Sequence, residues 1–264
     1  MSAAEEAIKA GDPQAALKLL QDQVRAKPAD AKLRVFLFQL LCTLGQWDRA
    51  LNQLNVAGEM DASTLAMVQT YREAIQCERL REQVFTGKKV PVLFGEPETW
   101  VALLIEALLR EGLGEHEQAR AMRDQAFDQA PACAGRADDQ PFAWIADADM
   151  RLGPVLEAVI NGRYYWVPFM HLAELKLDAP EDLRDAVWMP AQLQFTNGGE
   201  TVALIPTRYV GSDLGDPLQA LARKTDWVET SPDFFTGRGQ RLLTTDAGDL
   251  ALMDLRSLVF EQAE

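Results

Sequence analysis

A 34-residue spacing in the first half of the chain constrains its fold more than any other feature. Three pairs of residues share this spacing: Gly11 and Gly45, Ala16 and Ala50, and Leu20 and Leu54. Four later residues keep the same internal offsets, two periods and one residue further on: Gly114, Ala119, Ala126 and Pro131. Such a period indicates a structural unit that buries its apolar face by stacking on its neighbours.

A 34-residue unit of two helices joined by a turn is typical of tetratricopeptide repeats. Its glycine permits the turn, its alanine permits a close helix crossing, and its proline stops the second helix. Asp12 and Pro13 form a helix start, and Pro28 ends that helix. The apolar pattern predicts further helices over 31–44, 47–57 and 63–86. The helices expected over 98–112 and 115–130 would then close the array.

Stacked helical repeats leave a concave groove, and such grooves commonly hold a peptide or a helix. The period alone places six residues on this groove: Val35, Gln39, Cys42, Val101, Leu104 and Leu108. The helix over 98–112 is apolar on more than one face, so it should be buried on two sides. Since most of the six residues are apolar, we expect apolar contacts to capture the partner segment, with charge in a secondary role.

The second half of the chain changes character near residue 134. Eight short runs favour β-strands: 155–160, 163–169, 174–177, 193–196, 201–205, 242–245, 250–253 and 257–260. Tight-turn sequences such as Asn161-Gly162 separate them and favour hairpins. We therefore predict an α+β fold with two domains: a repeat domain over residues 1–134 and a mainly antiparallel β-rich domain over residues 135–264.

Net charge argues against nucleic acid as a partner. The chain carries a net charge of −14, and nucleic-acid affinity rests on lysine and arginine that neutralise phosphates. The N-terminus lacks the basic and apolar regions of a secretory signal, and no apolar run approaches the ~20 residues that cross a bilayer. Three scattered cysteines suit a reducing compartment. These features predict a cytoplasmic protein that does not insert into a membrane.

One polar constellation stands out at the start of the second half, where Asp147, Asp149 and Arg151 alternate along the chain. Two carboxylates on one side of an extended segment could hold a divalent cation, but a calcium loop would want an oxygen ligand where Arg151 stands. A structural ion-pair network fits better, in which Asp147 or Asp149 pairs with Arg151, Arg163 or Arg208. A partner-binding surface and a metal or catalytic site remain the alternatives. No other motif calls for a catalytic residue, a metal or a cofactor.

Several separate segments of the second half form a distinctive set: 144–149, 151–158, 165–168, 183–185 with Trp188, 205–209, 222–223 with Thr225 and Trp227, and 239–241. In this order, the segments resemble the ImpE/SciE-type family of type VI secretion accessory proteins. The first half matches this family only as a degenerate helical-repeat domain.

This resemblance implies a non-enzymatic adaptor without catalytic residues. It implies protein partners from the contractile-sheath machinery: the small sheath subunit and, through it, the AAA+ ATPase that disassembles the sheath. Two other functions remain open. One is a metal-dependent enzyme that uses Asp147 and Asp149, and the other is a generic tetratricopeptide-type scaffold unrelated to secretion.

Overall fold

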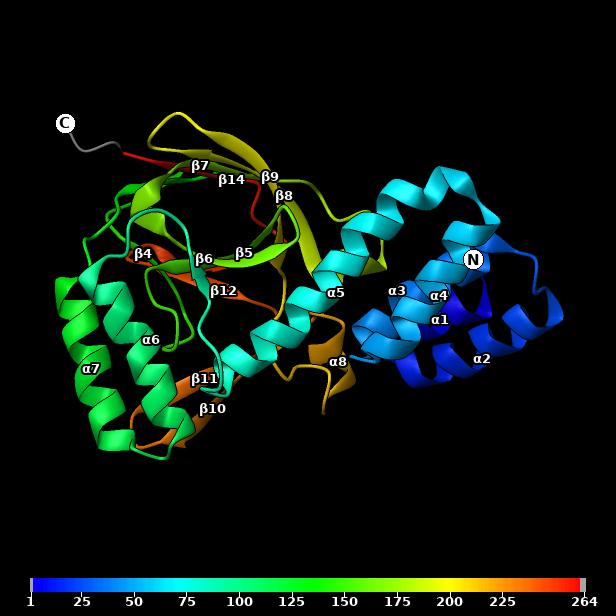
Figure 1. The fold of residues 1–264 in the computed structure, drawn as a ribbon, viewed down its shortest axis with the longest axis horizontal. Helices are drawn as coiled ribbons and strands as arrows, with labels where there is room; N and C mark the ends of the chain where they lie inside the picture. The colour runs from blue at the N-terminus through cyan, green and yellow to red at the C-terminus, as the bar shows by residue number, and fades with distance from the viewer. Residues whose placement is uncertain (1, 262–264) are drawn as a thin grey trace.

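The first half of the chain is helical. The computed structural model describes residues 2–261, and Figure 1 shows them with the helices at the right and lower left of the view. The α-helices are α1 (Ala3–Lys9), α2 (Pro13–Ala26), α3 (Ala31–Thr43), α4 (Trp47–Met60), α5 (Leu65–Phe85), α6 (Thr99–Gly112), α7 (His116–Gln129) and α8 (Pro217–Ala220). Three 3₁₀ turns are η1 (Ala62–Thr64), η2 (Phe169–His171) and η3 (Leu183–Ala186). None of these helices is long and apolar enough to cross a membrane within the described residues.

The predicted helix pairs form with the expected turns. Helix α2 begins at Pro13 behind Asp12, whose side chain accepts a hydrogen bond from the amide of Ala15. Gly11 and Gly45 take φ angles of +84° and +64°, which L-residues with a Cβ rarely adopt and which let α1 turn into α2 and α3 into α4. The prediction of a helical-repeat half is therefore confirmed.

The expectation that the last two helices close a single array is wrong. The α6–α7 pair lies at the opposite end of α5 from α1–α4 (Figure 1). Residues between α5 and α6 include the short strand β1 (Val92–Leu93), which pairs in parallel with β6. This connection carries the chain along the edge of the sheet, so α6 is not placed beside α5 as the next repeat would be.

Ala50 and Ala119 are fully buried at the helix crossings that the spacing indicated. Because a close crossing leaves no room for extra methylene groups, Ala50→Leu or Ala119→Leu should lower the free energy of unfolding by about 1–3 kcal/mol. Urea denaturation of each variant measures this loss. Changes below about 0.5 kcal/mol at both positions, the range of an ordinary surface substitution, would contradict close packing there.

The second half is built on strands, so the α+β prediction is confirmed. The remaining strands are β2 (Gly135–Ala137), β3 (Gln140–Phe142), β4 (Ile145–Asp147), β5 (Val155–Ile160), β6 (Arg163–Pro168), β7 (Leu172–Leu177), β8 (Trp188–Phe195), β9 (Glu200–Pro206), β10 (Thr225–Ser231), β11 (Phe234–Gly239), β12 (Leu242–Thr245), β13 (Gly248–Ala251) and β14 (Ser257–Phe260). One sheet has the order β1-β6-β5-β9-β8-β7-β14-β2-β3, a second has β13-β12-β4, and β10-β11 form a separate ribbon. Apart from β1, the pairs are antiparallel.

Hydrophobic packing continues from one half of the chain to the other. One buried cluster joins residues of α1–α6 to residues of the large sheet, among them Trp166 and Trp188. The ring of Trp188 lies 5.6 Å from that of Tyr71 in α5 and 6.0 Å from that of Trp47 in α4, measured between centroids. A second cluster fills the β-rich half itself. The division near residue 134 falls between α7 and β2, and its status as a domain boundary stays a prediction.

Candidate functional site

Arg81 lies at the centre of a buried cluster of charges where α5 meets the large sheet. Its Nε donates to Oε1 of Glu157 at 2.6 Å, and its Nη2 donates to Oε2 of the same carboxylate at 2.9 Å. Nη1 donates to Glu78 at 3.2 Å, and Nη2 also donates to the carbonyl oxygen of Arg208 at 2.8 Å. The guanidinium thus ties the helix to strand β5 and to the segment after β9.

Glu157 sits in a strand whose six residues are all buried. Besides Arg81, its carboxylate accepts hydrogen bonds from Arg241 and from the hydroxyl of Tyr164. Trp166 donates in turn from its indole nitrogen to the Tyr164 hydroxyl at 2.8 Å. A buried carboxylate with this many donors is held in its ionised form.

Asp147, at the end of β4, forms an ion pair with Arg241. Both side chains of this pair are fully buried. The hydroxyl of Tyr209 donates to Asp147 at 3.2 Å, and so does the backbone amide of Asp149 at 2.9 Å. Arg241 therefore links Asp147 to Glu157, since it bonds both carboxylates.

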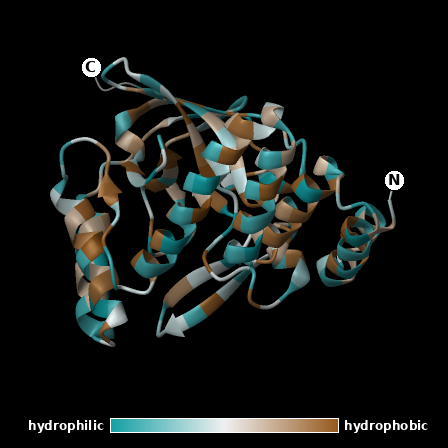
Figure 2. Cartoon of the chain, turned by 45° about the vertical axis from the view of Figure 1, so that its right-hand side comes forward, coloured by the Kyte–Doolittle hydropathy of each residue, from teal (hydrophilic) through white to brown (hydrophobic). Residues whose placement is uncertain are grey.

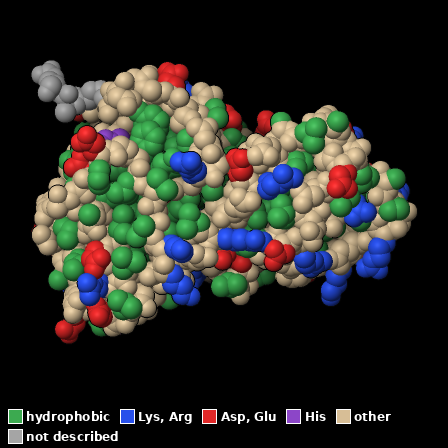
Figure 3. Space-filling view, in the orientation of Figure 1, with side chains coloured by type: hydrophobic (Ala, Val, Ile, Leu, Met, Phe, Trp, Pro, Cys, Tyr) green, Lys and Arg blue, Asp and Glu red, His purple; other side chains and the backbone are tan. Residues whose placement is uncertain are grey.

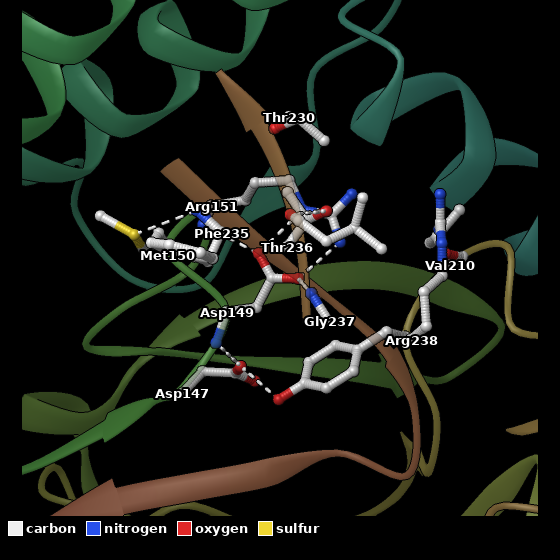
Figure 4. A network of polar contacts seen from close by, with 12 residues as sticks. Asp147, Asp149, Met150, Arg151, Val210, Thr230, Phe235, Thr236, Gly237 and Arg238 are labelled. Carbon is white, nitrogen blue, oxygen red and sulfur yellow. Dashed lines mark hydrogen bonds and ion pairs between the residues drawn. The ribbon is translucent and has the colours of Figure 1, made fainter. Parts of the chain in front are cut away.

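Asp149 points away from Asp147 toward β11 (Figure 4). Its carboxylate accepts from Nε of Arg151 at 2.8 Å and from Nη2 at 2.5 Å, a bidentate pair. The backbone amide of Gly237 donates to the same carboxylate at 2.8 Å. The guanidinium carbon of Arg151 lies 4.6 Å from the ring centroid of Phe85, at the end of α5.

The structure brings only part of the predicted ion-pair network together. Asp149 and Arg151 pair with each other, but the partner of Asp147 is Arg241 rather than Arg151, Arg163 or Arg208. Arg163 is exposed at the start of β6, where its side chain points to solvent. Arg208 donates to the carbonyl oxygens of Cys42 and Thr43 instead, so it caps the C-terminal end of α3.

Burial and pairing act in opposite directions on the two central carboxylates. Burial raises the pKa of Asp147 to about 7, although the guanidinium of Arg241 opposes this shift. Burial would also raise the pKa of Glu157, but Arg81 and Arg241 outweigh it and lower that pKa to about 2. Glu157, with two arginine partners, is the carboxylate that the fold keeps charged most firmly.

The ion pairs and hydrogen bonds of this cluster connect α5 to β4, β5 and the segment after β9. Three arginines form ion pairs with four carboxylates: Arg81, Arg151 and Arg241 with Glu78, Asp147, Asp149 and Glu157. Asp147 and Asp149 point their oxygens at guanidinium groups, so a cation would have to displace an arginine to bind there. Among residues 2–261, no group of three or more His, Cys, Asp or Glu side chains is placed to hold a metal.

The six residues expected on the repeat groove divide into two sets. Cys42, Val101, Leu104 and Leu108 are buried in the hydrophobic cluster, with exposed fractions from 0% to 4%. Their assignment to an open groove is wrong, because the β-rich half and the displaced α6–α7 pair bury the positions that a free repeat would leave open. Val35 and Gln39 differ, since both line a surface pocket.

This pocket, which we call the repeat pocket, lies where α1 and α3 face the segment that leads into η3. Its volume is about 560 Å³. Its lining is apolar at Ile8, Leu33, Val35, Phe36 and Leu183, and polar at Ser2, Glu5, Gln23, Lys32, Gln39, Glu181 and Asp182. The pocket combines apolar side chains of the repeat half with a rim supplied partly by the β-rich half.

Sequence reasoning missed Glu78, Arg81, Glu157 and Arg241 as members of the buried cluster. One signal was available: Glu157 interrupts a short apolar run of valine, leucine, alanine and isoleucine, and a charged residue in a buried strand needs a partner. Glu78 and Arg81 are three residues apart on α5, so they share a helix face.

On the face of the molecule drawn in Figure 3, acidic and basic side chains are interspersed among hydrophobic ones.

Two sequence models match the chain. Residues 139–259 match the model described as ImpE protein, and residues 7–74 match a tetratricopeptide repeat model. The first match contains every segment that carried the family resemblance, and the second covers α2–α4 and the first half of α5.

Similar proteins cover nearly the whole chain. A protein of Pseudomonas aeruginosa named "Type VI secretion system accessory component TagJ" is 55% identical over 262 residues, which are 99% of this chain and 92% of the relative. The crystal structure of protein VPA1032 from Vibrio parahaemolyticus superposes with a TM-score of 0.91 at 26% identity, covering 99% of this chain and 98% of that one. The fold described above is therefore shared with an experimentally determined structure.

Proposed function

This chain belongs to the ImpE family of type VI secretion accessory proteins, and we propose that it serves that system as a non-enzymatic adaptor in the cytoplasm. The observation that carries this proposal is the 55% identity to a type VI secretion accessory component over 99% of the chain. A second observation supports the absence of catalysis: the carboxylates best suited to chemistry, Asp147 and Asp149, are buried and bonded to arginines.

We infer that its partners are the small subunit of the contractile sheath and, through it, the AAA+ ATPase that disassembles the sheath. The family resemblance implies these partners, and the tetratricopeptide match over residues 7–74 supports a protein-binding role. The repeat pocket is the surface that we assign to the sheath subunit. Its apolar lining suits the anchoring side chains of an amphipathic helix.

A titration with peptides from the two ends of the small sheath subunit tests this assignment. Val35→Glu places a charge in the apolar lining of the repeat pocket, and Val35 is not among the residues packed against the core. Because a buried unpaired charge is costly, we expect the variant to bind at least about tenfold more weakly, or roughly 1.4 kcal/mol. Raising NaCl from ~0.1 M to ~1 M should change the affinity of the unaltered protein by less than about tenfold, since apolar contacts dominate.

Val202→Glu is the matched control, because it makes the same chemical change at a valine that is 71% exposed on β9, away from the repeat pocket. It should bind like the unaltered protein. Equal affinities for all three proteins would place the binding surface outside the repeat pocket. A collapse of affinity at high salt would show instead that charge dominates the complex. If neither peptide binds, the small sheath subunit is not captured by a terminal segment.

A further inference from the structure

The β10–β11 ribbon stands apart from the other two sheets. Its strands pair in antiparallel register from Thr225 opposite Gly239 to Ser231 opposite Phe234. It forms a sheet of its own, and in Figure 2 it extends downward from the body of the molecule. A two-stranded ribbon has two edges, and each edge presents backbone groups that pair with another segment or with water.

The outer edge of β11 is already occupied by other parts of the chain. The backbone amide of Met150 donates to the carbonyl oxygen of Phe235 at 3.4 Å, and the amide of Gly237 donates to the carboxylate of Asp149 at 2.8 Å. At Gly239, the amide donates to Oγ of Ser212 at 2.7 Å, and the carbonyl oxygen accepts from the amide of Tyr209 at 3.0 Å. Figure 4 shows Asp149 and Met150 beside this strand. Phe235, Gly237 and Gly239 therefore direct their backbone groups away from β10.

This arrangement determines which backbone groups of β10 are free. In an antiparallel pair, opposite residues alternate between those that exchange hydrogen bonds and those whose groups point outward. Thr225, Trp227 and Glu229 lie opposite Gly239, Gly237 and Phe235. Their amides and carbonyls consequently point away from β11, and within residues 2–261 no strand pairs with that side of β10.

The other sheet edges within the described residues are short. β3 has three residues and includes Pro141, β1 has two, β4 has three and β13 has four, whereas β10 has seven and no proline. Proline and short length are common ways to protect an edge from pairing. β10 lacks both, so it is the longest open edge that this part of the chain presents.

Exposed apolar side chains accompany the open edge. Trp227 and Val228 are each 40% exposed and Phe235 is 41% exposed. Trp227 and Phe235 share one face of the ribbon, since their register positions differ by two residues. A strand added to β10 would place its own side chains directly beside Trp227, whereas Phe235 lies one strand further away, on β11.

Charge at this edge selects the kind of segment that fits. Residues 225–235 include Asp226, Glu229 and Asp233 but no lysine or arginine. Asp226 pairs with Lys224, and Asp233 lies 3.4 Å from Arg120. Within residues 2–261, the carboxylate of Glu229 accepts a hydrogen bond only from the amide of Asp233. A second copy of this acidic chain would bring like charges together, whereas a basic segment would offset them.

We propose that the outer edge of β10 binds an extended segment of a partner protein by strand addition. The face of this segment that lies beside Trp227 and Glu229 carries both an apolar residue, next to Trp227, and a lysine or arginine, next to Glu229. Backbone hydrogen bonds to Thr225, Trp227 and Glu229 would hold the segment, with an apolar residue beside Trp227. This surface is separate from the repeat pocket and does not depend on it.

The probe, which we call the valine–lysine peptide, has nine residues, with threonine at the odd positions and valine and lysine in turn at the even positions, so that valine and lysine share one face. Amide hydrogen exchange, followed by NMR on the full chain, is the primary measurement. Binding should slow exchange at Thr225, Trp227 and Glu229, while Asp226 and Val228 change little because they are already bonded to β11. A peptide with proline at two positions, which cannot complete the ladder, should bind at least about tenfold more weakly. A peptide with glutamate in place of lysine should also bind more weakly.

Two variants at Trp227 distinguish the contribution of its backbone amide to peptide binding from that of its indole ring. Trp227→Ala keeps the outward amide, whereas Trp227→Pro removes it without removing a bond to β11. The proline variant should bind the valine–lysine peptide about two- to tenfold more weakly than the alanine variant, the range expected for one hydrogen bond. Circular dichroism should show that both variants keep the melting temperature of the unaltered protein within a few degrees.

Four results would overturn the proposal. The first is that the valine–lysine peptide does not bind at millimolar concentration, and the second is that protection from amide exchange does not alternate along β10. The third is that the lysine and glutamate peptides bind equally well. The fourth is that sedimentation shows a dimer of the unaltered protein that Trp227→Pro dissociates. The last result would identify a second copy of the chain as the occupant of the edge.

Discussion

Glu157→Gln is expected to lower the free energy of unfolding by about 3–5 kcal/mol, because it breaks a buried ion pair while leaving the cations in place. Among the described residues, Arg81 would keep only Glu78 as an ion-pair partner, and Arg241 would keep only Asp147. All of these side chains are at most 7% exposed, so water cannot replace the lost contacts. Urea denaturation monitored by tryptophan fluorescence would measure the difference.

The difference in the free energy of unfolding between Glu157→Gln and the unaltered protein should depend on pH. The pKa of Glu157 is about 2 in the folded protein and has a reference value of 4.5. A carboxylate with a lowered pKa stabilises the fold fully above its unfolded pKa, and this contribution is lost as the pH falls from about 4.5 toward 2. Since glutamine does not titrate, the difference between the two proteins should shrink by about 2 kcal/mol between pH 7 and pH 3.

Glu174→Gln is the matched control, because it makes the same change at a carboxylate whose partner, Lys176, is largely exposed. Its cost should stay below about 1 kcal/mol. If Glu157→Gln cost no more than Glu174→Gln, the buried cluster would not hold α5 against the sheet. A loss that did not shrink at low pH would show that the glutamine side chain disturbs packing rather than charge.

Local signals predicted the helices well. Asp12 with Pro13 starts α2, and the glycines at 11 and 45 end the helices before them. Each of these signals acts within a few residues, so its effect does not depend on the rest of the fold. The stacking of α6–α7 was not predictable in this way, because their position depends on how residues 86–98 run along the sheet.

Several strands that carry a clear apolar pattern were also predictable, whereas β10 and β11 were not. The runs at 155–160, 242–245 and 257–260 match β5, β12 and β14 at both ends. β10 and β11 were missed because their residues neither alternate in polarity nor form an apolar run, and four successive residues of β10 are exposed. A strand whose sequence lacks an apolar pattern cannot be identified from periodicity.

The buried cluster was the hardest feature to predict. Arg81 lies 76 residues from Glu157, and Asp147 lies 94 residues from Arg241. The pairing of Asp149 with Arg151 was predictable because the two residues are only two positions apart. It could not show which distant arginine reaches Asp147, since that depends on how β4, β5 and the end of β11 meet in three dimensions.

Gly239→Ala is expected to lower the free energy of unfolding by about 3–5 kcal/mol, through backbone strain and a clash together. The φ angle of Gly239 is +93°, a conformation that residues with a Cβ rarely adopt. A Cβ at this position would lie 1.8 Å from the carbonyl oxygen of Lys224 and 2.8 Å from its carbonyl carbon. Those are backbone atoms, so they cannot rotate aside as a side chain would. Gly239 also stands two residues before Arg241, so any shift would disturb the pairs with Asp147 and Glu157.

Gly198→Ala separates the two causes. Gly198 has a similar φ of +85°, but nothing lies within 4 Å of the position where its Cβ would be. This variant should lose only the strain contribution, about 1–2 kcal/mol. Urea denaturation of both variants gives the comparison directly, and the excess loss in Gly239→Ala measures the clash with Lys224. Equal losses would mean that the chain relaxes around residue 239, in which case the close approach of Gly239 to Lys224 does not determine where Arg241 sits.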